Sequence, residues 1–524
     1  MQKTSERLLD RNKEFQKSID PEEFAKSRES FSVELRKSKR LETVLKRRAI
    51  CTETETSEVP FVLLSIFPQL SNPAVDRRAK LECLIQIFNT QNSYEIVKFA
   101  LIELRKYLAS SDKNPPIQDI FELGFVSYLI SFLNQNNPCD IISESAWCLC
   151  NLAAGNNSCC LFLVDQGILE AAFPLIDIKN LEISEHIIWC IANLAGESEE
   201  IRKAIASYHY IETILDLVEI QDLPLNIYDV SWFCLSNIFR SFAPSIELLE
   251  SVVRTIKKFL RSKHSNIASN CLFILSYLSN LGKEHANTII NSGILSEILP
   301  LMHALEINIQ YPAIKIFGNI LSEGRQETQA LINMRILDYL ASTVSSISKK
   351  IRKESLFALS NVTAGTKTQI AQAVDHIVMI NAMKKLSDSS REVKLEASYV
   401  FSNAIHGGSC DSILKLVGSG LLKYVSQALQ YSELAFAKNL VFICKGVLDA
   451  YEYGLQNKIP FDFDVIDLFK DSGCLEGLED LKDEIQVQDQ GLYNEIVEIL
   501  SKYFGYGEDE GVQGESERIS TYSF

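Results

Sequence analysis

Three tryptophans and a recurring asparagine are the residues of this sequence best suited to binding a ligand. Trp147 lies four residues before Asn151, and Trp189 lies four residues before Asn193. Residues at this spacing share one face of a helix. Asparagine is a mediocre helix former, so its repetition in mid-helix needs a reason. Its amide could tie adjacent helices together in the core. Alternatively, a row of exposed amides could hold the backbone of an extended peptide, because each amide is both donor and acceptor.

The tryptophans favour the peptide interpretation. The chain has only three, Trp147, Trp189 and Trp232, and they occupy nearly the same place in consecutive segments. Neighbouring indoles would form slots for the methylene stems of Lys or Arg, with a cation–π attraction of about 0.5–2 kcal/mol each. Trp232 is irregular, because it lies five residues before Asn237 whereas Phe233 lies four before it. Either Phe233 lines the slot, or a local helix irregularity brings Trp232 into position.

The asparagines mark a repeat. They stand within short helical segments that end in small residues, at positions 151, 193, 237, 319, 361 and 403. The intervals are 42, 44, 82, 42 and 42 residues, and halving 82 leaves a vacancy near 278, where Tyr277 stands instead. A period near 42 with only helical patterns between the marks indicates an armadillo-type α-solenoid. We therefore expect an all-α, right-handed stack of about ten repeats, in which one helix of each repeat lines a concave groove.

Composition limits the classes of function. The chain has 524 residues and a net charge of −16, so a basic partner is favoured over duplex nucleic acid. The N-terminus has no apolar core of the kind that a secretory signal needs, and no run of about 18 apolar residues predicts a membrane span. The 13 cysteines are scattered, and the densest group, at 148, 150, 159 and 160, lacks a usual zinc spacing. Seven dispersed histidines accompany no catalytic motif, so we expect no enzyme, no cofactor and no metal site.

The first 50 residues differ from the rest of the chain. Residues 24–48 carry nine Lys/Arg against three Asp/Glu, and apolar residues recur between the basic ones. This pattern predicts a basic amphipathic helix that ends near Ile50. We expect a basic helical segment at 1–50, a flexible linker at 51–78, the repeats at 79–505 and an acidic disordered tail at 506–524.

Motifs in order along the chain resemble the importin α (karyopherin α) family over essentially its whole length. The stretch VELRKSKRLETVLKRR is similar to that family's importin-β-binding segment, and NPPIQDIFELG at 114–124 is similar to its first repeat. ESAWCLCNLAAG and WCIANLAGE resemble the helices of its major site for nuclear localisation signals. GCLEGLEDL, YNEIVEILSKYF and the acidic GEDE resemble its last repeat and tail. Each motif alone is weak, but their order is specific.

The resemblance implies two binding sites for Lys/Arg-rich localisation signals. The residues implied for the major site are Trp147, Asn151, Gly155, Trp189, Asn193, Glu197, Trp232 or Phe233, Asn237 and Arg240. Those implied for the minor site are Lys315, Asn319, Glu354, Phe357, Asn361, Glu396, Tyr399 and Asn403. Glu197 stands where the family usually has Asp, which keeps the charge that pairs with a lysine.

The minor site departs further from the family. Phe273, Phe357 and Tyr399 occupy positions usually held by Trp. Asn280 and Arg325 stand where acidic residues are expected. A phenyl face is a poorer cation partner than an indole, and Arg325 would repel a basic peptide. We therefore expect a competent major site and a weakened minor site.

The resemblance also implies partners and a transport cycle. Importin β would bind the basic segment through Arg28, Arg36, Lys37, Lys39, Arg40, Lys46, Arg47 and Arg48, although the family's early arginine run is thinned here. Without importin β, the Lys-Arg-Arg cluster would fold back into the groove as a mimic of cargo. Inside the nucleus, Ran-GTP would release importin β, and a CAS-type exportin would return the adaptor through its C-terminal repeats. The protein would thus shuttle between cytoplasm and nucleus, contact pore components, and neither bind nucleic acid nor insert into membranes.

A structural armadillo scaffold of the β-catenin type is the alternative. Such a scaffold would lack the basic N-terminal helix and would not need the Trp/Asn pairs. Binding of importin β to residues 1–50 would separate the two classes.

Overall fold

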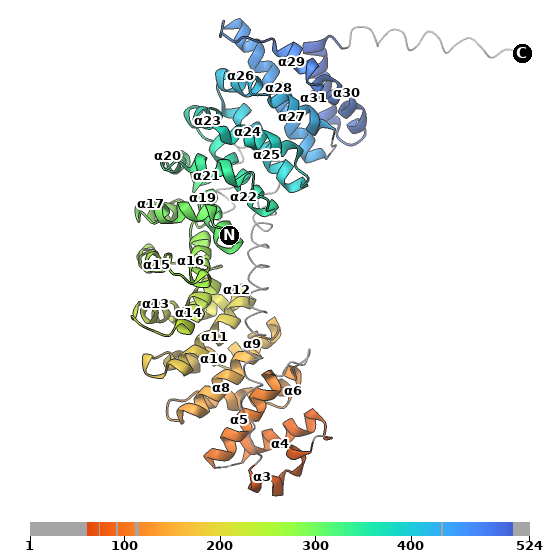
Figure 1. Ribbon diagram of the computed structural model, residues 1–524. Helices are drawn as coiled ribbons and strands as arrows, with labels where there is room; N and C mark the ends of the chain where they lie inside the picture. The colour runs from red at the N-terminus through yellow and green to blue at the C-terminus, as the bar shows by residue number, and fades with distance from the viewer. Residues whose placement is uncertain (1–59, 73, 91–92, 110–114, 431–432, 507–524) are drawn as a thin grey trace, which may run out of the picture. The chain divides into compact units, whose positions relative to one another are not determined.

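The computed structural model describes residues 60–72, 74–90, 93–109, 115–430 and 433–506. Every regular element in these ranges is a helix, which confirms the predicted all-α class (Figure 1). The chain divides into two compact units, with the boundary between Leu278 and Ser279. The residues expected to bind importin β, from Arg28 to Arg48, lie outside the described residues, as do residues 507–524 of the expected tail.

The first unit contains helices from α3 to α16. Its elements are α3 (Phe61–Ile66), η1 (Pro68–Ser71), α4 (Arg77–Asn89), α5 (Tyr94–Ala109), α6 (Ile117–Glu122), α7 (Phe125–Phe132), α8 (Cys139–Leu152), α9 (Asn157–Asp165), α10 (Ile168–Ala172), η2 (Phe173–Leu175), η3 (Ile178–Asn180), α11 (Leu181–Glu197), α12 (Glu199–Ala206), α13 (Tyr210–Glu219), α14 (Leu225–Ile238), α15 (Ile246–Phe259) and α16 (Ser265–Leu278).

The second unit contains helices from α17 to α31. Its elements are α17 (Lys283–Asn291), α18 (Leu295–Ile298), η4 (Leu299–His303), α19 (Ile307–Leu321), α20 (Arg325–Asn333), α21 (Ile336–Thr343), α22 (Lys349–Thr363), α23 (Lys367–Val374), α24 (Ile377–Met383), η5 (Lys384–Ser387), α25 (Arg391–Gly407), α26 (Cys410–Gly418), α27 (Leu421–Leu429), α28 (Leu434–Gln456), α29 (Val465–Asp471), α30 (Cys474–Ile485) and α31 (Gln490–Phe504).

Within each unit, the long helices that carry the asparagines pack on one another in chain order. In the first unit α8 contacts α5 and α11, and α11 contacts α14. In the second unit α22 contacts α19 and α25, and α25 contacts α28. A helix with neighbours on both sides buries most of its length, and α11 buries every residue from Ile183 to Ala195 except Glu185. Stacking therefore buries a continuous core that no single repeat could form, which confirms the predicted solenoid class.

The small polar residues after the asparagine helices begin the next helix. Asn156 caps α9 by accepting a hydrogen bond from the backbone N–H of Cys159, and Ser198 caps α12 in the same way through Ile201. Thr366 forms a reciprocal capping box with Gln369 at the start of α23. These caps explain why small polar residues follow the asparagine segments of the sequence.

A left-handed residue marks many of the junctions between the shorter helices. Glycines adopt this conformation at positions 124, 167, 293 and 420. His209 and Arg335 adopt it just before α13 and α21, with φ of 57° and 66°. A side chain raises the cost of the left-handed region by about 1–2 kcal/mol, so these two junctions store strain that glycine would avoid.

The predicted linker is partly helical where the structure describes it. Residues 61–66 form α3 and residues 68–71 form η1, and Leu63 is buried. The next helix, α4, begins at Arg77, two residues before the predicted start of the repeats. Among the described residues, no single helix is long and apolar enough to cross a bilayer. Two successive segments, Asn157–Asp165 and Ile168–Leu175, are long and apolar enough only when taken together, and the chain bends by 71° between them.

Candidate functional site

Most of the predicted major-site residues lie on α8, α11 and α14, the long helices of three successive repeats. We call the pairs Trp147/Asn151, Trp189/Asn193 and Phe233/Asn237 the first row. In each pair the aromatic residue precedes the asparagine by four positions, so both lie on one helix face. The helices pack side by side in the first unit, which brings the three pairs into register.

The asparagine amides of the first row join neighbouring repeats. Asn193 Nδ2 donates a hydrogen bond to the backbone carbonyl of Cys150 at 3.1 Å, and Asn237 Nδ2 donates to that of Ala192 at 2.9 Å. Asn193 is 1% exposed and Asn151 is 9% exposed. The expectation of an exposed row of amides is therefore wrong for this structure, because these side chains are buried and the amide nitrogens of Asn193 and Asn237 tie the repeats together. The sequence also allowed a structural role, in which the amides tie adjacent helices together, and this role is observed for Asn193 and Asn237.

Two amide atoms of the first row make no hydrogen bond in this packing. Among the described residues, Asn151 Nδ2 and Asn193 Oδ1 are buried without a hydrogen-bond partner. A buried polar atom without a partner costs about 1–3 kcal/mol. One atom is a donor and the other an acceptor, which is the pair that an extended peptide backbone would satisfy. A ligand that supplied these two hydrogen bonds would recover part of the cost.

Trp232 belongs to the core and not to the first row. Its side chain is 0% exposed, and its ring packs against Phe259 of α15 with the centroids 5.2 Å apart. Phe233 is half-buried, and its ring lies 6.1 Å from that of Trp189, tilted by 38°. A one-residue offset rotates a side chain by about 100° around a helix, so Trp232 points away from the row. Of the two alternatives left by the sequence, the structure places Phe233 beside Trp189 and excludes Trp232.

Trp147 is contacted from both flanking helices. The guanidinium carbon of Arg105, on α5, lies 4.3 Å from the indole centroid, and Arg105 Nε donates to Glu144 Oε2 at 2.6 Å. His186, on α11, stacks on the same indole with a centroid separation of 4.8 Å and an interplanar angle of 25°. Arg105 is only 2% exposed, so its charge is held inside the protein by Glu144 and by the indole.

Sequence reasoning missed both of these neighbours. Arg105 lies 42 residues before Trp147, so it occupies the tryptophan position of the preceding repeat, and the repeat period could have located it. His186 lies three residues before Trp189 on the same helix face. Its contact with Trp147 depends on side-chain conformation, which no spacing in the sequence specifies.

The remaining major-site residues lie at helix ends. Glu197 is the last residue of α11 and is half-buried. Arg240 Nη1 donates to the carbonyl of Gly196 at 3.3 Å, and Arg202 Nη1 donates to that of Ala195 at 3.0 Å. Cations at the C-terminal carbonyls of a helix stabilise it, so Arg240 has a structural role in this structure. At Gly155, a Cβ would lie 3.0 Å from the carbonyl oxygen of Leu152, which is closer than an ordinary van der Waals contact.

The predicted minor-site residues lie on α19, α22 and α25 of the second unit. All are buried, and they are Lys315, Asn319, Glu354, Phe357, Asn361, Glu396, Tyr399 and Asn403. We call this set the second row. Its amides repeat the pattern of the first, because Asn361 Nδ2 donates to the carbonyl of Gly318 at 3.1 Å and Asn403 Nδ2 to that of Ser360 at 3.0 Å. Asn319 Nδ2 donates instead to Ser279 Oγ at 3.0 Å.

The aromatic positions of the second row are chemically mixed. Lys315, Phe357 and Tyr399 follow one another at 42-residue intervals, so a lysine stands in the tryptophan position of its repeat. A Cβ on Gly318 would lie 3.4 Å from Phe357 Cδ1 and 3.6 Å from Glu354 Oε1, which shows close packing between α19 and α22. The expected weakness of the second row towards basic peptides stays a prediction.

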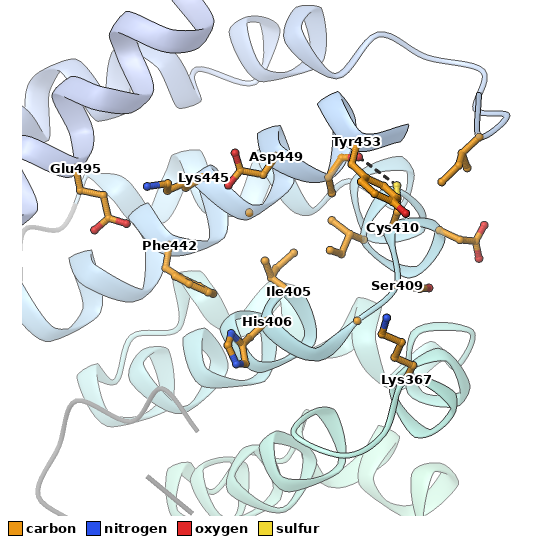
Figure 2. Close-up of a pocket in the computed structure, with 16 residues that line it drawn as sticks. Lys367, Ile405, His406, Ser409, Cys410, Phe442, Lys445, Asp449, Tyr453 and Glu495 are labelled. Atoms are coloured by element: carbon orange, nitrogen blue, oxygen red, sulfur yellow. Dashed lines mark hydrogen bonds between the residues drawn. The ribbon is translucent and has the colours of Figure 1, made fainter. Parts of the chain in front are cut away.

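A separate hollow of about 790 Å³ lies in the second unit between the end of α25, the start of α26 and α28 (Figure 2). Two of its charged groups, Lys445 and Asp449, are paired within the protein. Asp449 accepts hydrogen bonds from Lys502 Nζ at 3.2 Å and Tyr503 Oη at 2.5 Å, and Lys445 pairs with Glu498 at 3.3 Å. Cys410 Sγ donates to the carbonyl of Ala450 at 3.1 Å. The charges of Lys445 and Asp449 are thus compensated, whereas the first row has two unsatisfied amide atoms.

The clustered cysteines of the first unit serve packing. Burial raises the pKa of the Cys148 thiol well above its usual value, and its Sγ lies 3.7 Å from the carbonyl of Leu101. Cys160 Sγ donates to the carbonyl of Ala153 at 3.3 Å. In the part of the chain that the structure describes, no group of three or more His, Cys, Asp or Glu side chains is arranged to hold a metal ion.

Two family models match the N-terminal part of the chain. The importin beta binding domain matches residues 11–96, and the armadillo/beta-catenin-like repeat matches residues 113–154, which include α8 with Trp147 and Asn151. The crystal structure of an engineered protein resembles this chain with a TM-score of 0.68 and 20% identity, covering 79% of this chain and 97% of that one. At that identity the likeness concerns the fold alone.

Two of the curated relatives are importin alpha subunits. Importin subunit alpha-B of Dictyostelium discoideum is 31% identical over 313 residues, which is 59% of this chain and 58% of that protein. Importin subunit alpha-1a of Oryza sativa subsp. japonica is 26% identical over 320 residues, which is 60% of this chain and 58% of that protein. The chain thus matches less than two thirds of the length of each relative.

Proposed function

We propose that this chain, which belongs to the importin α family, is an adaptor for nuclear import that binds Lys/Arg-rich localisation signals and links them to importin β. The proposal thus goes from the family to a specific function. It places the binding site for the localisation signal at the first row, on α8, α11 and α14.

The observation that carries the proposal is the state of the first-row amides. Asn193 uses Nδ2 to hold the preceding repeat, while its Oδ1 and Asn151 Nδ2 have no hydrogen-bond partner among the described residues. An extended backbone offers N–H and C=O groups in alternation, so it can satisfy both atoms without regard to sequence. Backbone binding of this kind suits a receptor that must accept many different cargo proteins.

Charge and aromatic surface supply the preference for basic side chains. The chain carries a net charge of −16, which attracts cationic peptides over a distance of about 8–10 Å at physiological ionic strength. Trp189 and Phe233 offer ring faces to a lysine or arginine stem, and Glu197 at the end of α11 offers a carboxylate to its charge. The second row, with Lys315 in a tryptophan position, is proposed as the weaker site.

Residues 1–50 are proposed as the importin-β-binding segment, and the match of the importin beta binding domain to residues 11–96 supports this. The same segment is proposed to inhibit the groove when importin β is absent. A short tether gives an effective concentration on the order of 1 mM, so an intrinsic constant of about 10 μM would lower cargo affinity about 100-fold. Deleting residues 1–50 should remove that inhibition.

The rest of the cycle is proposed from family membership. Release of importin β by Ran-GTP, return through a CAS-type exportin at the C-terminal repeats, and transient contact with the nuclear pore would make the protein shuttle between cytoplasm and nucleus. A β-catenin-type scaffold would not require the segment matched at residues 11–96.

A pull-down with purified importin β tests the adaptor function directly. The full chain should retain importin β, and a variant with Arg36, Lys37, Lys39 and Arg40 changed to Gln should lose most of it. The matched control changes the four exposed cations Lys203, Lys257, Lys258 and Arg261 to Gln, which removes the same charge from another surface. Equal retention by all three proteins would refute the proposed role of the segment.

A further inference from the structure

His186 occupies the position where the sequence predicts a slot between Trp147 and Trp189. Its imidazole stacks on the Trp147 indole with the centroids 4.8 Å apart and the planes 25° apart. A methylene stem held between two flat groups needs a plane-to-plane distance of about 7–8 Å, because each carbon contact takes about 3.5–4.0 Å. The Trp147 face that meets α11 is therefore filled by the protein itself.

Hydrogen bonds hold the imidazole in this position. His186 Nδ1 lies 3.3 Å from Ser143 Oγ, and Ser143 Oγ donates to Glu182 Oε1 at 3.0 Å. The hydroxyl has one hydrogen, which it gives to Glu182, so Nδ1 of His186 is the donor towards Ser143. His186 is also 6% exposed. Opening the slot would require breaking this chain of hydrogen bonds as well as the stack.

Trp147, which is half-buried, is also contacted from α5. The Arg105 guanidinium lies 4.3 Å from the indole centroid and is fixed by Glu144. Trp147 thus already has a cation on its ring from α5 and an imidazole from α11. The next pair of rings is also close, because the Trp189 and Phe233 centroids lie 6.1 Å apart and Trp189 is 7% exposed, whereas Phe233 is half-buried.

We propose that His186 is a specificity-determining residue that closes the Trp147 slot, so that the first row does not hold a cationic stem against the face of Trp147 that meets α11. This inference rests on the proposed function of the groove and narrows its ligand class. The fitting signal tolerates a residue without charge at the Trp147 end.

Substitution of His186 tests this in the full chain, with a fluorescein-labelled Gly-(Lys)5-Gly peptide as probe and fluorescence anisotropy as readout. His186→Ala should open the slot and tighten binding about 5- to 10-fold, the range expected of one added cation–π contact. His186→Phe keeps an aromatic ring against Trp147 and should gain less than about 2-fold. Adding Trp147→Leu to His186→Ala should remove the gain, because the new contact is to the indole.

His303→Ala is the matched control. His303 stacks on Tyr339 at 4.8 Å and 28°, and its Nε2 lies 2.6 Å from Ser342 Oγ, so the variant removes an equivalent stacked imidazole outside both rows. Its affinity for the peptide should equal that of the unchanged chain. A His186→Ala affinity no higher than that of His186→Phe, or a gain that survives Trp147→Leu, would overturn the inference while leaving the proposed function in place. Absence of saturable binding by every variant would overturn both.

Discussion

The side-chain nitrogen Nδ2 of Asn193 donates a hydrogen bond to the backbone carbonyl of Cys150, 3.1 Å away and one repeat earlier in the chain. The bond leaves Oδ1 of the same amide buried and without a partner among the described residues. One half of the side chain therefore stabilises the stack of α8 and α11, and under the proposed function the other half would bind a ligand. The hydrogen bond between repeats accounts for a mid-helix asparagine despite its low helix propensity.

Replacing Asn193 with Ala should affect stability and peptide binding together. Loss of the hydrogen bond to Cys150 should lower the free energy of unfolding by about 1–2 kcal/mol. Loss of Oδ1 should weaken binding of a lysine-rich peptide about tenfold. Urea denaturation and fluorescence anisotropy measure the two effects.

Asn439→Ala is the control for Asn193→Ala. Asn439 Nδ2 donates to Ser398 Oγ at 2.9 Å, so this variant also loses a buried inter-helix hydrogen bond, but away from the first row. It should lose similar stability with no change in peptide affinity. A comparable loss of affinity in both variants would mean that Asn193 acts through stability alone.

Neighbouring aromatic residues of α14 should respond oppositely to alanine substitution. Trp232→Ala should destabilise the first unit by about 3–5 kcal/mol, because it empties a fully buried site against Phe259. Phe233→Ala should cost much less stability but weaken binding of the lysine-rich peptide about 5-fold or more. Thermal unfolding measures the loss of stability in each variant, and peptide titration measures the loss of affinity. A binding defect confined to Trp232→Ala would contradict the assignment of Phe233 to the first row.

These cases show how far the sequence alone could go. The 42-residue recurrence of asparagine predicted the helices, their stacking and the face that carries the row, because each repeat must satisfy the same packing. It could not decide between Trp232 and Phe233, since a one-residue offset turns a side chain by about 100° and only neighbouring rings select the outcome. It also predicted an open slot at Trp147, whereas the stacked His186 depends on a chain of hydrogen bonds through Ser143.

The ion pair between Arg352 and Asp388 should stabilise the second unit at neutral pH and fail in acid. The atoms Nε and Oδ2 lie 2.8 Å apart, and both side chains are largely buried. Burial alone would raise the pKa of Asp388, but the hydrogen bond from Arg352 and the backbone N–H of Ser390 lower it overall. A carboxyl group with a lowered pKa stabilises the fold above its ordinary pKa of about 4, and the contribution is lost as pH falls through the lower value.

Asp388→Asn should therefore lower the free energy of unfolding by about 3 kcal/mol at pH 7. It should also flatten the loss of stability between about pH 4 and pH 2. Asp375→Asn, which removes one partner of the exposed Lys415, serves as the control and should leave the denaturation midpoint unchanged. An acid dependence identical to that of the unchanged chain would show that Asp388 is not the group responsible.

Left-handed junctions should respond to substitution through backbone conformation alone. Gly124→Ala and Gly420→Ala should each destabilise by about 1 kcal/mol, since φ is +82° and +92° while a Cβ would meet no atom within 4 Å. Arg335→Gly, at φ 66°, should relieve strain and leave stability equal or slightly higher despite loss of the Asp338 ion pair. Differential scanning calorimetry compares them, and a neutral Gly→Ala change would rule out this explanation.

Titration of a fluorescein-labelled lysine-rich peptide tests the proposed groove most directly, using the full chain and the chain without residues 1–50, each with and without Asn151→Ala and Asn193→Ala. The account predicts saturable 1:1 binding that weakens with salt, tightens on deletion of residues 1–50, and falls about tenfold or more in the double variant while helix content is kept. Absence of saturation, or an affinity that the double variant leaves unchanged, would contradict it.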